Sequence, residues 1–499
     1  MATKNFEVII VGAGISGAAI SYELARYTDI KSIAIIEKYG DIATLNSSGT
    51  SNSQTIHVGD IETNYTLEKA AITKRTAKMV EKYCLQHNYQ NEIIFSHQKM
   101  ALGVGEKEVE FLLHRYEEFS ELFPYLEVWN KEKLKELEPR VIFDQNGNER
   151  PEEVVAIGAI GEWTTVDYGK MSKSLIKNAQ KEESSNVELF LNTQVLDIEK
   201  SKKRGYVVKT LNGVYYADFV VVDAGAHSLF LAHKMGFGLE LGCLPVAGSF
   251  YMTNQKMLNG KVYMIQNPKL PFAALHGDPD ILANGNTRFG PTALVLPKLE
   301  RYKSGTFMDF WKTLRFDSKI ATALWKLLKE RDIRNYIFRN FLFEIPVLNK
   351  YLFLKDARKI VPGLKINEFE YAKGFGGIRP QVLDKDKQKL MLGEASIYTG
   401  EGIIFNMTPS PGATSCLGNA ERDLKYIVQY LGKKFDQNRF NDELTEGEYC
   451  ALPEPIASQK AIVNLIRAEI ERTHEKYLQD IQHGKPDEDF WSKPSSKLK

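Results

Sequence analysis

The stretch from Glu7 to Tyr27, EVIIVGAGISGAAISYELARY, constrains the fold more than any other part of the chain. A β-branched run precedes three glycines spaced G-x-G-x-x-G, and a segment rich in Ala, Leu and Glu follows, which predicts a strand, a tight turn and a helix. Gly12 lets the chain reverse, Gly14 allows a pyrophosphate to come close, and Gly17 lets helix and strand pack together. A second apolar run ends at Glu37, about 20 residues further on, where a ribose hydroxyl needs an acceptor. The stretch therefore predicts a dinucleotide-binding βαβ unit, which NAD and FAD both fit.

Composition limits what can surround this unit. The 499 residues suffice for two interwoven domains and a terminal extension, and a formal charge of +1 gives no reason to expect nucleic acid as a partner. Cys84, Cys243, Cys416 and Cys450 are far apart and form no CxxC, which favours a reducing compartment. No apolar run approaches the roughly 18 residues of a spanning helix, and the first strand begins almost at Met1, so we expect a protein without a signal peptide that stays on the cytoplasmic side.

Later segments bring further turns toward the same ligand. Residues 67–138 are expected to be a long charged helical region, and residues 186–228 contain successive strands separated by Lys, Gly and Asn turns. The last of these strands, residues 217–224, runs into Gly225. A third return is expected near residues 411–414, where Pro-Gly-Ala-Thr opens a helix whose N-terminus would face the ligand. Three returning loops favour FAD over NAD, because FAD is longer and its ring projects into a second domain.

These motifs resemble the FAD-binding pattern of the D-amino-acid-oxidase-like flavoprotein superfamily. Within that superfamily, SNSQTIHVGDIETNYT, TTVDYGKMSKSL and TPSPGATSC resemble the malate:quinone oxidoreductase family in its more divergent form. The three stretches occupy residues 51–66, 164–175 and 408–416, and the resemblance covers about residues 5 to 430.

The resemblance implies an α/β fold (α+β overall), with a Rossmann-like FAD-binding domain interleaved with a mixed-sheet substrate domain, as in D-amino-acid oxidase and glutathione reductase. The expected division is residues 1–80, 151–240 and 371–432 for FAD binding, 81–150 and 241–370 for the substrate and membrane-facing domain, and 433–499 for a helical C-terminal extension.

The family implies FAD-dependent oxidation of (S)-malate to oxaloacetate, with electrons passed to membrane quinone by a peripheral protein on the cytoplasmic face of the inner membrane. The nearest alternative is an FAD-dependent L-2-hydroxyglutarate oxidase or dehydrogenase, and an amino-acid oxidase is more distant. A non-catalytic FAD-binding, membrane-associated protein is the alternative of another class. No HExxH, GxSxG elbow or ligand cluster at metal spacing is present, so neither metal catalysis nor nucleophilic hydrolysis is expected.

Oxidising a 2-hydroxy dicarboxylate requires a base for the hydroxyl proton and cationic groups for the two carboxylates. His276 is the favoured base, because it follows an expected strand at residues 270–275 and because related L-2-hydroxyglutarate oxidases carry a histidine facing the flavin at the end of a comparable strand. His57 is the second candidate, as a base or as a residue that positions the ring, and either histidine could instead be structural. Arg379 in GFGGIRPQ is the first choice for a substrate carboxylate, and Arg288 is the second.

The residues expected to hold FAD come from the glycine loops, the strand ends and the polar loop after the second strand. They are Gly12, Gly14, Ser16, Gly17, Glu37, Lys38, Asn52, Gln54, Thr55, Val195, Ala224, Gly225, Gly377, Gly412, Ala413 and Thr414. Asn52, Gln54 and Thr55 are equally consistent with an ordinary polar turn.

Residues 302–365 alternate basic side chains with Phe, Trp, Leu and Tyr at roughly helical spacing. The pattern is typical of a helix lying in a membrane interface with lysines toward acidic headgroups. It is also typical of the core-facing side of a substrate-domain helix, and both interpretations stay open.

Overall fold

The fold is taken from a computed structural model. It describes residues 4–266, 275–343, 345, 348–391, 395–408, 411–446, 459, 462–468 and 470–471. Cys450, Gly393, Glu394 and most of the strand expected at 270–275 lie outside these residues.

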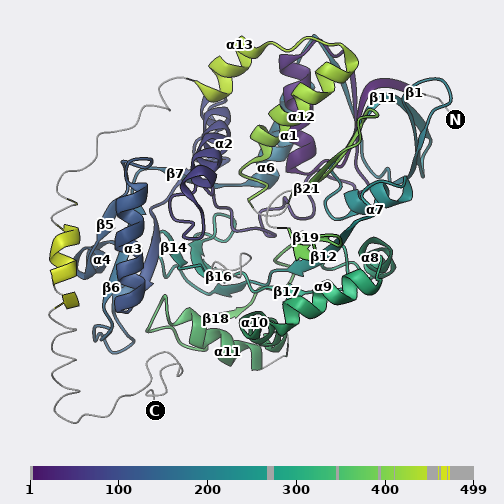
Figure 1. The fold of residues 1–499 in the computed structure, drawn as a ribbon. Helices are drawn as coiled ribbons and strands as arrows, with labels where there is room; N and C mark the ends of the chain where they lie inside the picture. The colour runs from purple at the N-terminus through teal and green to yellow at the C-terminus, as the bar shows by residue number, and fades with distance from the viewer. Residues whose placement is uncertain are drawn as a thin grey trace.

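The first sheet has eight strands and contains the predicted βαβ unit, β1–α1–β2 (Figure 1). Its main path runs β21-β22-β11-β1-β2-β8, and the β9–β10 pair continues from β11. Strand β1 is parallel to β2 and to β11, and β11 is parallel to β22, so the centre of this sheet is parallel, as in a Rossmann-like fold. The strands are β1 (Lys4–Val11), β2 (Ser32–Ile36), β8 (Asn186–Phe190), β9 (Val195–Lys200), β10 (Tyr206–Thr210), β11 (Val214–Val222), β21 (Ala395–Tyr398) and β22 (Ile403–Met407).

The second large sheet is mixed and lies below the first in Figure 1. Its order is β18-β13-β16-β15-β14-β4-β6-β5, and a four-stranded sheet, β17-β12-β19-β20, and a two-stranded pair, β3-β7, complete the strands. The remaining strands are β3 (Ile94–Ser96), β4 (Lys99–Val104), β5 (Glu127–Trp129), β6 (Val154–Ala159), β7 (Trp163–Val166), β12 (Leu241–Ala247), β13 (Tyr251–Thr253), β14 (Lys261–Met264), β15 (His276–Pro279), β16 (Thr287–Gly290), β17 (Leu294–Val295), β18 (Phe369–Tyr371), β19 (Ile378–Asp384) and β20 (Lys389–Leu390). The two large sheets confirm the predicted fold class, whereas the domain boundaries stay a prediction.

Helices α1, α6 and α12 pack side by side against the first sheet. The helices are α1 (Ile15–Tyr27), α2 (Leu67–Gln86), α3 (Glu106–Phe119), α4 (Lys131–Leu137), α5 (Pro139–Ile142), α6 (Tyr168–Ala179), α7 (His227–Lys234), α8 (Phe307–Leu314), α9 (Ser318–Lys329), α10 (Arg331–Leu342), α11 (Leu348–Ala357), α12 (Cys416–Leu431) and α13 (Gln437–Phe440), with short turns η1 (Ser304–Thr306) and η2 (Asn441–Thr445).

The expectation of a long helical region over residues 67–138 is correct only in part, because β3, β4 and β5 separate its helices α2, α3 and α4. Strand β4 pairs with β6 and β14, which lie far away in sequence. Long-range sheet pairing therefore overrides the helical composition of this region.

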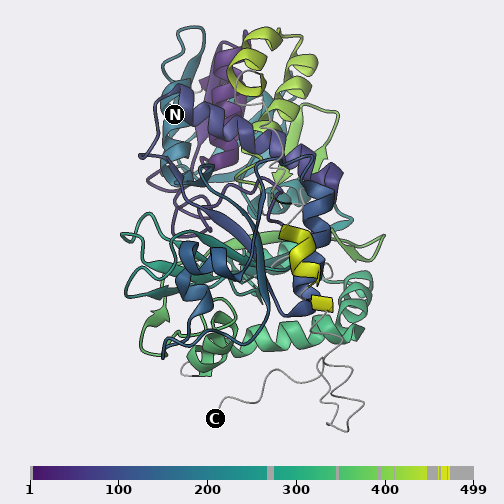
Figure 2. The same ribbon diagram turned by 90° about the vertical axis from the view of Figure 1, so that its left-hand side faces the viewer.

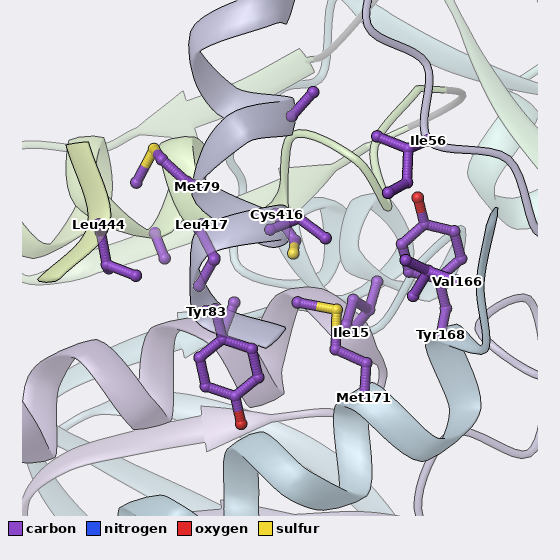
Figure 3. Packing of buried hydrophobic residues seen from close by; sticks show 14 of the residues in the cluster. Ile15, Ile56, Met79, Tyr83, Val166, Tyr168, Met171, Cys416, Leu417 and Leu444 are labelled. Atoms are coloured by element: carbon purple, nitrogen blue, oxygen red, sulfur yellow. The ribbon is translucent and has the colours of Figure 1, made fainter. Parts of the chain in front are cut away.

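Both faces of β1 are buried, which explains its uninterrupted apolar sequence. Val8 and Ile10 belong to the core beneath α1, α6 and α12, whereas Ile9 and Val11 face a second core with α7 and α8. Figure 3 shows the first core, where Tyr83, Met171 and Cys416 meet from three different helices. A third core lies between the second large sheet and the helices that cover it.

Residues 302–365 contain the four helices α8–α11, which lie at the opposite end of the molecule from α13 (Figures 1 and 2). Several large apolar side chains on them are exposed, including Met308, Trp325 and Phe338. Among the described helices, none combines the length and apolarity needed to cross a bilayer.

Candidate active site

A cavity of about 470 Å³ is lined by residues of all three returning loops and of the second domain. The predicted site residues on its wall are Gly12, Gly14, Ser16, Glu37, Lys38, Asn52, Thr55, His57, Val195, Ala224, Gly225, Gly377, Arg379, Gly412, Ala413 and Thr414. The other four predicted residues, Gly17, Gln54, His276 and Arg288, are not among the described residues that line it. None of these assignments is tested by the placement alone, and each stays a prediction.

The first glycine loop is closed so tightly that side chains are excluded. Gly12 has φ +112°, and a Cβ there would lie 2.5 Å from the carbonyl oxygen of Asp223. A Cβ on Gly17 would lie 2.0 Å from the oxygen of Gly12, so Gly17 serves helix packing behind the cavity wall. The N-terminus of α1 follows directly. The backbone N–H of Ile15 there donates to Ser47 Oγ at 2.9 Å, and the positive end of the helix suits an anionic ligand.

Glu37 and Lys38 directly follow β2 at one side of the cavity. Glu37 Oε2 accepts from the backbone N–H of Ala13 at 2.9 Å, and Oε1 accepts from that of Tyr39 at 3.0 Å, so the carboxylate is fixed against the glycine loop. Lys38 forms an ion pair with Glu300, which reaches in from the other domain.

His227 also approaches Glu300, at 3.5 Å, and lines the cavity. Burial, aided by Lys38, lowers the pKa of His227 to about 4. Sequence reasoning missed both Glu300 and His227, because their partners are distant in the chain.

The third loop holds the loop of His57 in place through Thr414. The buried Thr414 Oγ1 accepts from the backbone N–H of His57 at 3.1 Å and lies 3.0 Å from the hydroxyl of Tyr168. Tyr168 in turn donates to the carbonyl of Thr55 at 3.0 Å. Helix α12 itself begins at Cys416, so residues 411–415 form a turn before it rather than its first residues.

His57 forms a histidine–carboxylate pair on the cavity wall. Its Nδ1 lies 2.7 Å from Oε1 of Glu62, whose side chain is 2% exposed. The other oxygen of Glu62 accepts from the backbone N–H of Gly59 at 2.8 Å. Sequence reasoning singled out His57 but not Glu62, although the H-x-x-x-x-E spacing within one polar loop was a usable signal.

His276 lies in a buried cluster next to this pair. Its ring stacks on Tyr263 with centroids 4.4 Å apart, and Tyr263 packs edge-on against His57. Nδ1 of His276 lies within ion-pair distance of Asp278, and Asp278 is 3.4 Å from Nζ of Lys261. His276 begins β15, which pairs with β16 as an antiparallel hairpin.

Burial lowers the pKa of His276 below its usual value, despite the opposing effect of Asp278. Burial alone would raise the pKa of Asp278, but His276 and Lys261 lower it below its usual range. The cluster therefore places the buried imidazole of His276 beside the buried carboxylate of Asp278 and the ammonium group of Lys261.

Arg288 is fully buried, with Nη1 3.1 Å from Asp280 and 3.2 Å from the carbonyl of Gly49. Gln54 donates to the same Asp280 at 3.0 Å. The guanidinium lies 4.7 Å from the ring centre of Phe250, and Phe250 lines the cavity. The charge of Arg288 is thus compensated by Asp280, and the guanidinium lies behind Phe250, which forms part of the cavity wall.

Arg379 lies on β19, opposite Val246 of β12, and reaches the cavity wall. The preceding Gly377 packs closely, since a Cβ there would lie 2.6 Å from the side chain of Asn46. Asn46 also accepts from the backbone N–H of Ile378 at 2.9 Å and so ties β19 to the polar loop.

In the described part of the chain, no three His, Cys, Asp or Glu side chains gather in a way that could hold a metal ion. Cys84, Cys243 and Cys416 are free and buried, and burial raises the pKa of each thiol.

A family model described as malate:quinone oxidoreductase (Mqo) matches residues 4–468. A protein of Campylobacter jejuni named probable malate:quinone oxidoreductase is 59% identical over 449 residues, covering 89% of this chain and 100% of that protein. A Helicobacter pylori protein named malate:quinone oxidoreductase is 48% identical over 449 residues, covering 89% of this chain and 99% of that protein.

Solved structures share the fold at lower identity. L-α-glycerophosphate oxidase from Mycoplasma pneumoniae, solved with FAD bound, matches with a TM-score of 0.59 and 20% identity over 91% of this chain and 99% of that one. Glycine oxidase from Geobacillus kaustophilus matches with a TM-score of 0.57 and 18% identity over 89% of this chain and 100% of that one. These likenesses confirm the predicted oxidase-like architecture.

Proposed function

Because the chain belongs to the malate:quinone oxidoreductase family, we propose that it oxidises (S)-malate to oxaloacetate with FAD and passes the electrons to a membrane quinone. The observation that carries this proposal is the single cavity wall on which the dinucleotide loop, His57 and Arg379 meet. An alcohol base and a carboxylate-binding cation next to a dinucleotide site are what this reaction requires.

The residues on the cavity wall fit FAD. The absence of side chains at Gly12 and Gly14 leaves a cradle at the N-terminus of α1 for a pyrophosphate, since a Cβ on Gly14 would lie 3.2 Å from Ser47 Oγ. Glu37 keeps acceptor capacity for ribose hydroxyls beyond its two backbone bonds. The turn 411–414 and Gly225 supply further backbone groups along the cavity.

FAD, when bound, would supply the acceptor for the hydride from C2 of malate and the donor of electrons to quinone. The chain supplies the rest. Arg379 is the residue we assign to a malate carboxylate, with bidentate geometry available to its guanidinium. His57 and His276 are the candidate bases, and Arg288, whose charge Asp280 compensates, lies buried behind Phe250.

The proposal is tested by anaerobic titration of the purified flavoprotein with L-malate, with L-2-hydroxyglutarate as the comparison. Bleaching of the visible flavin band by malate, and not by hydroxyglutarate, is the expected result. Bleaching by hydroxyglutarate alone would move the assignment to the neighbouring oxidase class. A yellow protein that neither acid reduces would refute oxidation of 2-hydroxy acids.

We also propose that α8–α10 form the surface that meets the membrane, on its cytoplasmic side. Met308 and Trp311 on α8, Trp325 on α9 and Phe338 on α10 are between 43% and 63% exposed, and Phe341 is 56% exposed. Basic side chains lie near these apolar ones. For example, Nζ of Lys329 is 5.9 Å from the ring centre of Trp325. Apolar side chains interleaved with lysines suit an interface with acidic headgroups. Helix α8 also connects to the cavity, because Asp309 and Tyr302 lie on the cavity wall.

A further inference from the structure

We infer that Glu62 is the positioning residue that makes His57 the acceptor of the hydroxyl proton of the substrate. The inference rests on the proposed function and goes beyond it by naming which histidine acts and what prepares it. Its starting point is the contrast between the two histidine–carboxylate pairs of the site, His57–Glu62 and His276–Asp278.

The pairs differ in access to the cavity. The His57 side chain is 18% exposed and lines the cavity, whereas the His276 side chain is 5% exposed and does not line it within the described part of the chain. Tyr263 lies between the two rings, stacked on His276 and edge-on to His57. A substrate in the cavity therefore meets His57 first.

Glu62 determines which nitrogen of His57 carries the proton. A carboxylate only accepts hydrogen bonds, so the proton of the 2.7 Å contact sits on Nδ1. Nε2 then presents a lone pair, and no hydrogen bond to it comes from any residue the structure describes. This is the tautomer that a general base needs.

Glu62 is itself held rigidly. Its second oxygen accepts from the N–H of Gly59 at 2.8 Å, and its carbonyl accepts from Nη2 of the buried Arg115 at 2.7 Å. At the other end of the loop, Thr414 accepts from the backbone N–H of His57. The backbone at both ends of the pair is thus tied to elements outside its own loop, by Thr414 and by Arg115.

The step assigned to the pair is one proton transfer. The O–H bond of the malate hydroxyl breaks, an N–H bond forms at Nε2, and the imidazolium that results is stabilised by the charge of Glu62. The electron pair left on oxygen forms the carbonyl of oxaloacetate as the C2 hydrogen leaves as hydride to the flavin.

Glu62→Gln is the most discriminating test, because the backbone N–H of Gly59 determines how the Gln side-chain amide is oriented. The N–H of Gly59 needs an acceptor, so the Gln oxygen turns to it and the Gln amide faces Nδ1 of His57. The tautomer is then reversed, and Nε2 becomes a donor. Glu62→Asp keeps a carboxylate and should recover part of the activity.

Two measurements follow in the flavoprotein. In protein labelled with ¹⁵N-histidine, the His57 signal, assigned by its loss in His57→Asn, should report Nδ1–H in the parent and Nε2–H in Glu62→Gln. In anaerobic stopped-flow, flavin reduction by malate should fall about 100-fold or more in Glu62→Gln. Flavin content and absorbance confirm that each variant is folded.

Glu110→Gln is the matched control, because Glu110 pairs with the exposed His114 on α3 at 3.0 Å, outside the cavity. It should change neither readout. If Glu62→Gln fails to load flavin, His57→Asn carries the kinetic test, and the parent spectrum alone decides the tautomer.

Three results would overturn the inference: an Nε2–H tautomer in the parent protein, normal flavin reduction in Glu62→Gln with the tautomer reversed, or a large loss in Asp278→Asn with none in Glu62→Gln, which would assign the proton to His276. Failure of malate to reduce the parent flavin would instead refute the proposed function. The tautomer measurement does not depend on that outcome.

Discussion

Glu23, in the middle of α1, is a carboxyl group that the fold buries completely. Neither oxygen has a hydrogen-bond partner among the residues that the structure describes. Burial raises the pKa of Glu23 well above its ordinary value, and Glu421 and Asp423 raise it further. A carboxyl with a raised pKa in the folded state stabilises the fold at low pH, and this contribution is lost as the pH rises through the folded-state pKa.

We therefore expect Glu23→Gln to stabilise the protein at pH 8 by about 2 kcal/mol, because the amide never ionises. The gain should shrink as the pH falls and vanish below about 4.5, where Glu23 is neutral in both states. Melting temperatures of both proteins across this range provide the measurement. A stability difference that does not change with pH would show that Glu23 ionises without cost.

At the scale of elements, local sequence predicted the βαβ unit because its determinants are local. The glycines, the β-branched run before them and Glu37 lie within one supersecondary motif, and strand, turn and helix follow from them directly. The break of the 67–138 region into three helices was not predictable in this way, since β4 exists only by pairing with distant β6 and β14.

The residues of the candidate site were likewise predictable only where their determinants are local in sequence. His57 was found from its polar loop, but its tie to Thr414 joins residues 357 positions apart, and no local pattern contains it. Arg288 was predicted as the second choice for a substrate carboxylate, and only the three-dimensional fold reveals Asp280 as its buried partner.

Helices α9 and α10 carry the prediction that belongs to this scale. Replacing Trp325 and Phe338 together by Ser should weaken sedimentation with vesicles of acidic phospholipid at least severalfold, because both exposed apolar side chains are lost. Flavin reduction by malate in solution should be unchanged.

Ile72→Ser is the control for that experiment, since Ile72 is 68% exposed but lies on α2. Equal vesicle binding by the double variant and the parent would remove α9 and α10 from the membrane surface.

At the scale of the whole molecule, the cavity is lined by residues of both domains, so its ligand should hold them together. Removing the flavin should lower the melting temperature, and FAD at 100 times its dissociation constant should restore about 2.7 kcal/mol by mass action. Riboflavin should restore much less, because it lacks the pyrophosphate and adenosine groups that suit the glycine loop and Glu37. Thermal melts of the three forms test this, and equal recovery with riboflavin would contradict the assigned role of the loop.

The strand order of the first sheet also has a consequence for how the protein folds during its synthesis. A ribosome releases β1 first, yet the C-terminal part of β11 lacks its neighbour on the side away from β1 until β22 has been made, and β22 begins about four hundred residues after β1. Thr414, which fixes His57, emerges later still. At elongation rates of about 5–20 residues per second, the glycine loop waits on the order of tens of seconds for its last neighbours. The nascent chain therefore carries an open apolar sheet edge in the meantime, and the cavity wall is complete only after Thr414 has been made.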